Sequence, residues 1–383
     1  MKKIKNIEKA AERIKKAVQN KERIILYGDS DLDGISSVVI LEEAIKTLGG
    51  HIESAFFPDR ENNGYGINLH ALELLKDKAP ALFVTLDLGI GNIKEVDMAN
   101  KLGFEVIIVD HHETLKGIPN ASIIVDPKQP TDDYPFKGLA NVGITYNLCL
   151  ELLGEDISEN LKNSFLELTA LGTIADMVPK IEQNQEIIEQ GIRSLKNTFR
   201  PALIVFADVL GEGVIFENSL QKIISTLNAA ESINFENESY VLLTSSSLPK
   251  CKEIIEKLLN KNLNKQHQIK SIVRDMEKRI SQKSDEPIIF EGDRAWRLTL
   301  AGAIASIVCN KYEKPAFIFK KMDEESCGSV RNPEGTNSVD AMKSCGELLI
   351  TYGGHAQASG FRIKNENLEK FKNSLTEYFK NNN

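Results

Sequence analysis

The chain has 383 residues, of which 42% are hydrophobic and 27% charged, and its formal net charge is -8. This length exceeds what one hydrophobic core usually supports, so we expect a soluble globular protein with two domains. The acidic balance excludes a protein that coats nucleic acid through bulk positive potential, although a local binding groove is still allowed. Five cysteines without a C-x-x-C pair favour a reducing cytoplasm, and we expect neither a membrane span nor a signal peptide.

The first third of the chain alternates between short apolar runs and helical patterns. After an amphipathic N-terminal helix, we predict strands at 23–27, 51–57, 81–88, 105–109 and 122–125, and helices at 36–48, 67–78 and 92–102. The almost unbroken apolar run of the third strand is typical of a strand that is covered on both faces. The alternation predicts a doubly wound, mostly parallel α/β sheet, whose ligands bind at the carboxyl ends of the strands.

The remaining residues predict a connector and a second, smaller α/β domain. Helical patterns cover 139–175 and 186–196, and a charged, mainly helical stretch follows. A second pattern near Pro287 predicts strands at IIF, AFIF and CGSV, helices at 301–310 and 338–350, and a C-terminal helix. We therefore divide the chain into an α/β domain at 1–195, a helical connector at 196–285 and a smaller α/β domain at 286–383.

An acidic turn with Asp29, Asp31 and Asp33 follows the first strand and is closed by Gly34. Alternate residues of an extended segment point the same way, and converging carboxylates repel one another unless a cation lies between them. A hard divalent metal is the natural partner. The EF-hand calcium loop begins similarly but needs a Glu where this chain has Ile40. For this motif alone, a solvated acidic turn is the simpler alternative.

Further ligand-type residues follow later strands: Asp87, the triplet Asp110-His111-His112, and Asp176 after a helical stretch. We expect them at the same sheet edge. Imidazole with several carboxylates suits Mn²⁺, and Mg²⁺ or Zn²⁺ also accepts such a set. These are more ligands than one ion needs, which favours two metals that share a carboxylate and hydrolyse a phosphoester. For the triplet alone, a surface turn with two histidines is the alternative.

In combination these motifs resemble a known superfamily. The ordered set GDSDLDG, LDLGI, VDHHE and GTIADMVP is similar to the four motifs of the DHH phosphoesterases, and GSVRNPEG with YGGHAQASG is similar to their associated C-terminal domain. Within the superfamily, PDRENNGYGI, the AGAIAS helix before EKPAFIF, and GSVR before GGH resemble the RecJ single-strand-specific exonucleases. The resemblance covers nearly the whole chain.

The resemblance implies two divalent metal ions, Mn²⁺ first and Mg²⁺ as the alternative. Asp31 would bind one ion, Asp33 the other, and Asp87 would bridge them. His111 and Asp176 would complete the second site, with Asp29 beside the first. The implied metal ligands are thus Asp29, Asp31, Asp33, Asp87, His111 and Asp176.

The resemblance also implies catalytic and substrate-binding groups. Asp110 would orient a histidine, and His112 would face the scissile phosphate. A terminal 5′ phosphate would be held by arginine forks and a hydroxyl, while glycines would let backbone N–H groups approach the anion. The implied catalytic residues are Asp110, His112 and His355, and the implied substrate-binding residues are Arg60, Ser329, Arg331, Gly353, Gly354 and His355.

Two features depart from the RecJ pattern. An N-A-x-G-R stretch is usual in the middle region, but here Asn228-Ala229-Ala230 is followed by Glu231-Ser232. An anion therefore lies near the place of a cation that could meet the nucleic-acid backbone. We also expect no strand-gripping OB domain like that of bacterial RecJ, and therefore weak, salt-sensitive binding with low processivity, or a preference for short substrates. A separate strand-binding protein is the partner that would replace such a domain.

The function expected from these residues is a cytoplasmic, metal-dependent 5′→3′ exonuclease of single-stranded DNA, and also of RNA, that acts in DNA repair or recombination. The alternative is a phosphodiesterase of dinucleotides or short oligonucleotides, of the nanoRNase type. A third hypothesis is a non-catalytic replication scaffold. It is disfavoured because such proteins lose metal carboxylates, whereas this chain keeps Asp31, Asp33 and Asp87.

Overall fold

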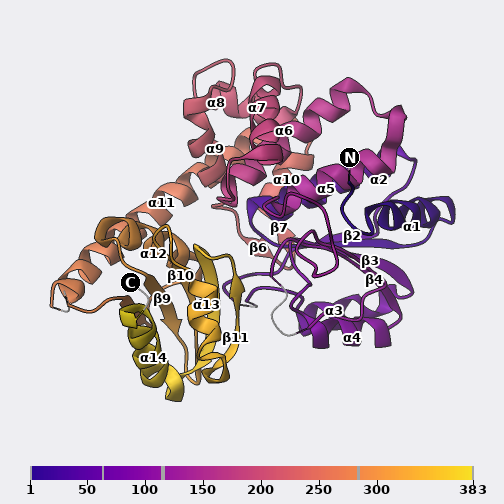
Figure 1. Cartoon of the computed structure of the whole chain (residues 1–383). Coiled ribbons are helices and arrows are strands. Elements are labelled where there is room, and N and C mark those ends of the chain that lie inside the picture. The colour runs from indigo at the N-terminus through magenta and orange to yellow at the C-terminus, as the bar shows by residue number, and fades with distance from the viewer. Residues whose placement is uncertain (1, 63, 114–116, 283–284, 382–383) are drawn as a thin grey trace. The chain divides into compact units, whose positions relative to one another are not determined.

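A computed structural model describes residues 2–62, 64–113, 117–282 and 285–381 (Figure 1). The chain forms two compact units, Met1–Asn262 and Leu263–Asn383. The boundaries expected at 195 and 285 stay predictions. None of the helices in the described residues has the length and apolarity needed to cross a bilayer.

The first unit is built on a five-stranded sheet in which every neighbouring pair is parallel, in the order β2-β1-β3-β4-β5. The strands are β1 (Ile24–Gly28), β2 (Ser54–Phe56), β3 (Ala81–Leu86), β4 (Phe104–Val109) and β5 (Ile123–Val125). The chain runs outward from β1 to β2 and then returns past β1 to β3. The switch point of this doubly wound sheet therefore lies between β1 and β3, which is where such folds bind ligands.

Helices cover both faces of this sheet (Figure 1). Successive residues of β1 point to opposite faces of the sheet, so Leu26 packs in one hydrophobic core and Tyr27 in the other. The first core includes α1 (Ile7–Gln19), α2 (Leu32–Thr47) and α5 (Asn141–Leu153), and the second includes α3 (Leu69–Leu75) and α4 (Ile93–Lys101). The predicted doubly wound parallel α/β fold is confirmed.

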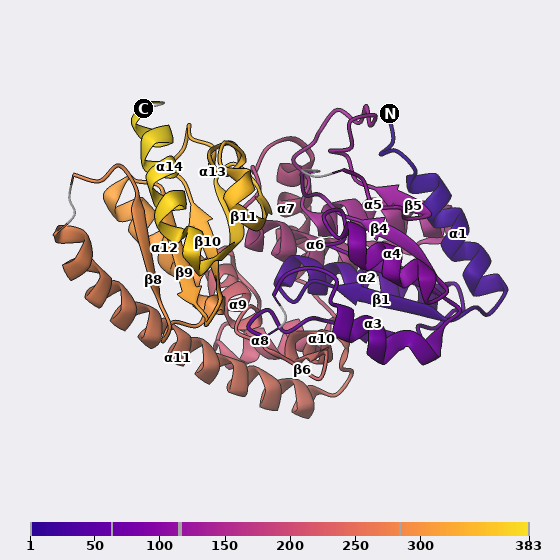
Figure 2. The same cartoon turned by 90° about the horizontal axis from the view of Figure 1, so that it is seen from below.

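Further helices extend the first core. They are α6 (Glu159–Ala175), α7 (Glu182–Leu195), α8 (Pro201–Val209), α9 (Leu220–Leu227) and α10 (Glu238–Thr244), with a hairpin of β6 (Ser232–Ile233) and β7 (Glu236–Asn237) between the last two. The long helix α11 (Leu248–Ser281) follows (Figure 2). Its Ile255 packs in the core of the first unit and its Met276 in a core of the second.

The second unit contains a mixed sheet in the order β11-β12-β10-β9-β8, with only the β8–β9 pair parallel. Its strands are β8 (Ile289–Asp293), β9 (Ala316–Lys321), β10 (Glu325–Arg331), β11 (Leu349–Gly354) and β12 (Ala358–Lys364). One core contains α12 (Leu298–Tyr312), and another contains α13 (Ser338–Lys343) and α14 (Leu368–Asn381). Short 3₁₀ helices are η1 (Lys76–Lys78), η2 (Gly154–Asp156), η3 (Glu217–Ser219), η4 (Gly346–Leu348) and η5 (Asn365–Asn367).

Two local predictions were wrong. The helix expected at 338–350 ends at Lys343, and 349–354 forms the edge strand β11 because its backbone pairs with β12. The helix expected from Ser36 begins earlier, at Leu32. Asp33 therefore lies in the first helical turn and not in an extended segment.

Candidate metal centre

The acidic residues predicted from the strand ends gather at the carboxyl edge of the parallel sheet. Asp29 follows β1 and Asp87 follows β3, so the two flank the switch point. The Asp29 N–H donates to the Leu86 carbonyl at 3.1 Å, which joins the ends of the two strands. Asp87 has a left-handed backbone with φ 65°. Such a conformation is costly for a non-glycine residue, and it is typical of functional sites.

Backbone N–H groups at the starts of two helices hold the carboxylates of Asp31 and Asp33 in place. Asp31 is the N-cap of α2, and its Oδ1 accepts hydrogen bonds from the N–H groups of Asp33 and Gly34 at 3.1 Å. The two carboxylate oxygens of buried Asp33 accept from the first N–H groups of α5, those of Asn141 at 2.8 Å and Val142 at 2.7 Å. Two helix N-termini therefore stabilise negative charge in this turn.

Glycines allow the close packing around the turn. A Cβ at Gly34 would lie 2.5 Å from the backbone oxygen of Asp29, and one at Gly172 would lie 3.4 Å from the Cα of Asp33. Gly172 lies on α6, and Asp176 follows the last residue of that helix. The close approach of α6 thus brings Asp176 to the sheet edge.

His111 is buried and faces these carboxylates. Its Nδ1 lies 3.0 Å from the carbonyl oxygen of Leu139. A carbonyl only accepts, so Nδ1 carries the proton and Nε2 presents its lone pair in the neutral ring. Nε2 lies 3.1 Å from Asp87 Oδ1, 3.8 Å from Asp176 Oδ2 and 3.9 Å from Asp33 Oδ2. This is the tautomer that a metal-binding histidine needs.

Asp87 belongs to several groups of possible metal donors. Ligand atoms of Asp33, Asp87 and His111 lie within 4.8 Å of one another, and so do those of Asp29, Asp31 and Asp87. A third such group joins Asp87 to Asp110 and His112. Burial, followed by the charges of neighbouring carboxylates, raises the pKa of Asp87 well above its usual value and that of Asp33 to about 8. Oxygen donors with one imidazole fit Mn²⁺ or Mg²⁺.

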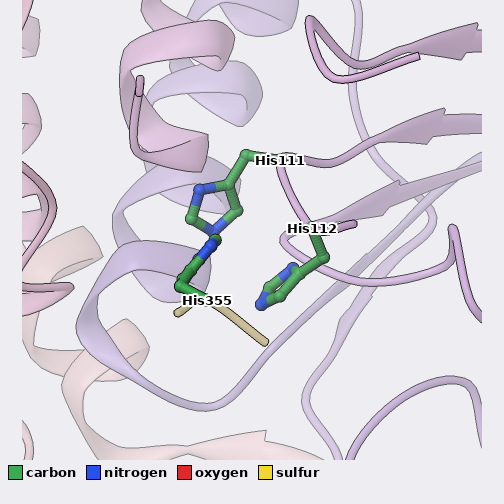
Figure 3. A group of neighbouring side chains, drawn as sticks. All are labelled: His111, His112 and His355. Atoms are coloured by element: carbon green, nitrogen blue, oxygen red, sulfur yellow. The ribbon is translucent and has the colours of Figure 1, made fainter. Parts of the chain in front are cut away.

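Beside this cluster, the side chains of Asp110 and His112 are hydrogen-bonded to each other. Asp110 Oδ1 lies 2.7 Å from His112 Nδ1 and accepts the His111 N–H, while Oδ2 accepts the Ile90 N–H. Burial raises the pKa of Asp110, but the nearby His112 ring and these hydrogen bonds outweigh it, so the net pKa is lowered. An ionised Asp110 fixes the orientation of the His112 ring; both histidine rings are drawn in Figure 3.

Arg60 contacts the acidic turn directly. Its Nε donates to Asp29 Oδ1 and its Nη2 to Asp31 Oδ2, both at 2.9 Å. The guanidinium therefore neutralises part of the cluster. In addition, the Tyr65 hydroxyl donates to the Asp87 carbonyl at 2.8 Å and lies 3.1 Å from His112 Nδ1. Tyr65 lies in the loop PDRENNGYGI, but the sequence did not predict it as a site residue.

A second missed residue is Asp126, which directly follows β5 and is fully buried. Burial, followed by the charge of Asp110, raises its pKa to about 8. Its Oδ1 accepts the Lys128 N–H at 2.8 Å. Its position at a strand end was the available sequence signal. Among the described residues, it belongs to none of the groups of possible metal donors.

The other predicted substrate-binding residues lie in the second unit. Ser329 and Arg331 are alternate residues of β10, and a Cβ at Gly302 of α12 would lie 3.6 Å from the Ser329 hydroxyl and 3.2 Å from Arg331 Nη2. Gly353 and Gly354 end β11, and His355 follows them in the turn before β12. The structure thus groups these residues within their own unit.

Comparison with known families identifies both halves of the chain. Residues 23–173 match the DHH family, N-terminal domain, and residues 285–381 match the DHHA1 domain. The chain therefore contains a DHH domain and a DHHA1 domain. Its DHH domain contains the parallel sheet and every predicted metal ligand except Asp176, and its DHHA1 domain contains Ser329, Arg331 and the Gly353–His355 turn.

Curated relatives extend beyond this DHH and DHHA1 pair. The single-stranded-DNA-specific exonuclease RecJ of Bacillus subtilis is 32% identical over 98% of this chain, and the chain spans 48% of that relative. RecJ of Thermus thermophilus is 26% identical over 98% of the chain, which spans 54% of it. The chain therefore covers about half the length of these relatives.

Solved structures share the fold. A crystal structure of exonuclease RecJ bound to manganese is 25% identical and has a TM-score of 0.78, with 99% of this chain and 95% of that chain covered. RecJ from Thermus thermophilus in complex with Mn²⁺ is 24% identical with a TM-score of 0.82, with 99% and 55% covered. The resemblance to the DHH phosphoesterases and to RecJ that the motifs indicated is thus confirmed.

Proposed function

We propose that the chain hydrolyses phosphodiester bonds of single-stranded DNA with two divalent metal ions, as a 5′→3′ exonuclease in DNA repair or recombination. The observation that carries this proposal is that two donor groups, Asp33–Asp87–His111 and Asp29–Asp31–Asp87, share Asp87, with every member except Asp31 buried. A second support is the similarity to proteins named single-stranded-DNA-specific exonucleases.

In this proposal Asp31, with Asp29 beside it, holds one ion, and Asp33, His111 and Asp176 hold the other. Asp87 lies between the two groups and contacts both. When bound, such a pair of ions would make a water more acidic and would stabilise the charge that develops on the phosphate oxygens. The chain itself supplies fixed ligand geometry, because α2, α5 and the Leu139 carbonyl hold the carboxylates and the imidazole in place.

Two histidines are proposed to act on the substrate beside the metal ligands. His112, oriented by Asp110, faces the scissile phosphate and stabilises its developing charge. His355 is proposed as a further catalytic group. In the DHHA1 domain, it closes over the strand together with the preceding Gly353 and Gly354, whose lack of side chains lets the backbone approach an anion.

A second set is proposed to bind the substrate end. Arg60, Ser329 and Arg331 hold the 5′ phosphate, because guanidinium groups match phosphate oxygens in pairs. Manganese is the preferred ion, as in the RecJ structure bound to manganese, and magnesium is the alternative. RNA is proposed as a second substrate, the cytoplasm as the compartment, and a separate strand-binding protein as a partner.

The test compares DNA and RNA strands labelled at the 5′ or the 3′ end, with and without a 5′ phosphate, in Mn²⁺ and in Mg²⁺. We expect mononucleotides to be released first from the 5′ end of single-stranded DNA. Release first from a 3′ end would overturn the polarity. Asp87→Ala should be inactive, while Asp77→Ala, at an exposed acidic residue of η1, should behave as wild type.

A length series separates the remaining alternatives. A rate that collapses beyond a few nucleotides would favour the short-oligonucleotide phosphodiesterase. No cleavage of any oligonucleotide by wild type or Asp87→Ala would favour the non-catalytic scaffold.

A further inference from the structure

The first turn of α2 places one proposed metal ligand on each side of Leu32. Backbone N–H groups at the start of a helix have no partner within the helix. Asp31 Oδ1 accepts two of them, from Asp33 and Gly34. The Leu32 N–H instead donates to Asn228 Oδ1 at 3.0 Å, from a residue 196 positions away in the chain. The metal-binding turn is thus tied to a distant element.

The surroundings of Asn228 hold it in place. It follows the last residue of α9, and its own N–H bonds back into that helix. The β6–β7 hairpin that comes next is anchored at two points. Glu231 accepts from Lys261 of α11 at 3.0 Å, and the Phe235 carbonyl accepts the Phe57 N–H at 2.9 Å. A side chain on so constrained a backbone can fix the group that it binds.

We propose that Asn228 is a positioning residue for the metal centre. Its side-chain oxygen fixes the Leu32 amide and thereby the directions of the Asp31 and Asp33 carboxylates. Asp31 Oδ1 accepts from the N–H groups of Asp33 and Gly34, and its Oδ2 contacts Arg60, so the Asn228 bond fixes the first N–H group of the helix, which the Asp31 side chain does not bind. This inference rests on the proposed function, since it concerns the ligands assigned there.

The proposal also explains the middle segment, whose sequence departs from the RecJ pattern. Asn228 has a role there that needs no cation at the following positions. Glu231 is engaged with Lys261, so this anion stabilises the hairpin behind Asn228. The segment therefore acts on the metal turn through a neutral amide.

The test is calorimetric titration of the full-length, metal-free chain with Mn²⁺. Loss of one hydrogen bond to the turn in Asn228→Ala should weaken Mn²⁺ binding roughly five- to tenfold. Asn228→Asp keeps the acceptor oxygen and should stay within about threefold of wild type. The matched control is Asn337→Ala, which removes an Asn that caps α13 through the N–H groups of Val339 and Asp340 in the other unit. It should lower thermal stability without changing Mn²⁺ affinity.

A second measurement, amide hydrogen exchange of Leu32 in the metal-free protein, is independent of metal binding. Exchange should be faster in Asn228→Ala than in wild type. Unchanged Leu32 exchange, or equal Mn²⁺ affinity of the two proteins, would overturn the proposal. Absence of Mn²⁺ binding by wild type would instead overturn the proposed function. Should Asn228→Ala not fold, Asn228→Ser, whose side chain is shorter, must bind Mn²⁺ more weakly than Asn228→Asp; equal affinities would overturn the proposal.

Discussion

Asp87→Asn should stabilise the metal-free protein and destabilise the metal-bound one. Asp87 is buried among carboxylates, and burial together with the charges of Asp33, Asp31 and Asp176 raises its pKa well above the usual value. Asparagine has nearly the same shape, carries no charge and tolerates the left-handed backbone at this position. The substitution therefore removes the electrostatic cost without new strain.

The pKa of Asp33 shows how costly a buried carboxylate is in this cluster. A shift from 3.8 to about 8 corresponds to roughly 5 to 6 kcal/mol of lost stability at pH 8, at about 1.4 kcal/mol per pKa unit. The pKa of Asp87 is raised in the same direction, so we expect Asp87→Asn to raise the free energy of unfolding at pH 8 by roughly 0.5 to 3 kcal/mol, the usual size of a single-substitution effect. In a domain of this size, that raises Tm by roughly 1 to 12 °C.

Manganese should reverse the order. Each ion adds about 2.7 kcal/mol at a concentration of one hundred times its Kd, and wild type gains this from two sites, whereas Asp87→Asn has lost the shared ligand. Thermal unfolding followed by circular dichroism, in EDTA and in excess Mn²⁺, measures both states, with exposed Asp77→Asn as the control. The reasoning is refuted if Asp87→Asn is less stable than wild type in EDTA, or if it keeps the full Mn²⁺ shift.

Three further outcomes are expected. Burial raises the pKa of both Asp33 and Asp126 in the folded state to about 8, so the folded state binds more protons than the unfolded state. The stability of the metal-free protein should therefore fall between pH 4 and pH 8 by about 1.4 kcal/mol per pH unit for each group. Urea unfolding in EDTA measures this, and a stability that rises with pH would contradict it. Asp110→Asn should lower kcat about 10- to 100-fold, because the His112 ring is no longer held in its orientation. The Mn²⁺ affinity measured by calorimetry should change little. A loss of metal binding as large as the loss of rate would contradict the orienting role. Arg60→Ala should reduce the preference for a 5′ phosphate over a 5′ hydroxyl about tenfold or more. The control Arg193→Ala, at an exposed residue of α7, should keep this preference. An unchanged preference in kcat/KM would show that Arg60 does not bind the 5′ phosphate.

Strand ends could be predicted from the sequence because the apolar runs of a parallel sheet are nearly continuous and stop where polar residues begin. Asp29, Asp87 and the Asp110 triplet each follow such a run, and the rule that ligands bind at that edge brought them together. Asp176 was expected at the same edge although it follows a helix and not a strand. The close approach of α6 at Gly172 is the physical reason for that place.

Contacts between residues far apart in the chain were not predictable. Nothing in the local pattern pairs Leu32 with Asn228, His111 with the Leu139 carbonyl, or Arg60 with the acidic turn. These bonds depend on how helices and loops pack, whereas periodicity reports only which face of an element is buried. The same limit explains the wrong helix at 338–350, since pairing with β12 decided the conformation of β11.

The central claim is that two divalent ions share Asp87. Anomalous diffraction from crystals of the full chain grown in Mn²⁺ measures this directly. Our account predicts two manganese peaks about 3.5 to 4 Å apart, with carboxylate oxygens of Asp87 bound to both. A single peak, two peaks without a common ligand, or manganese bound away from Asp87 would contradict it.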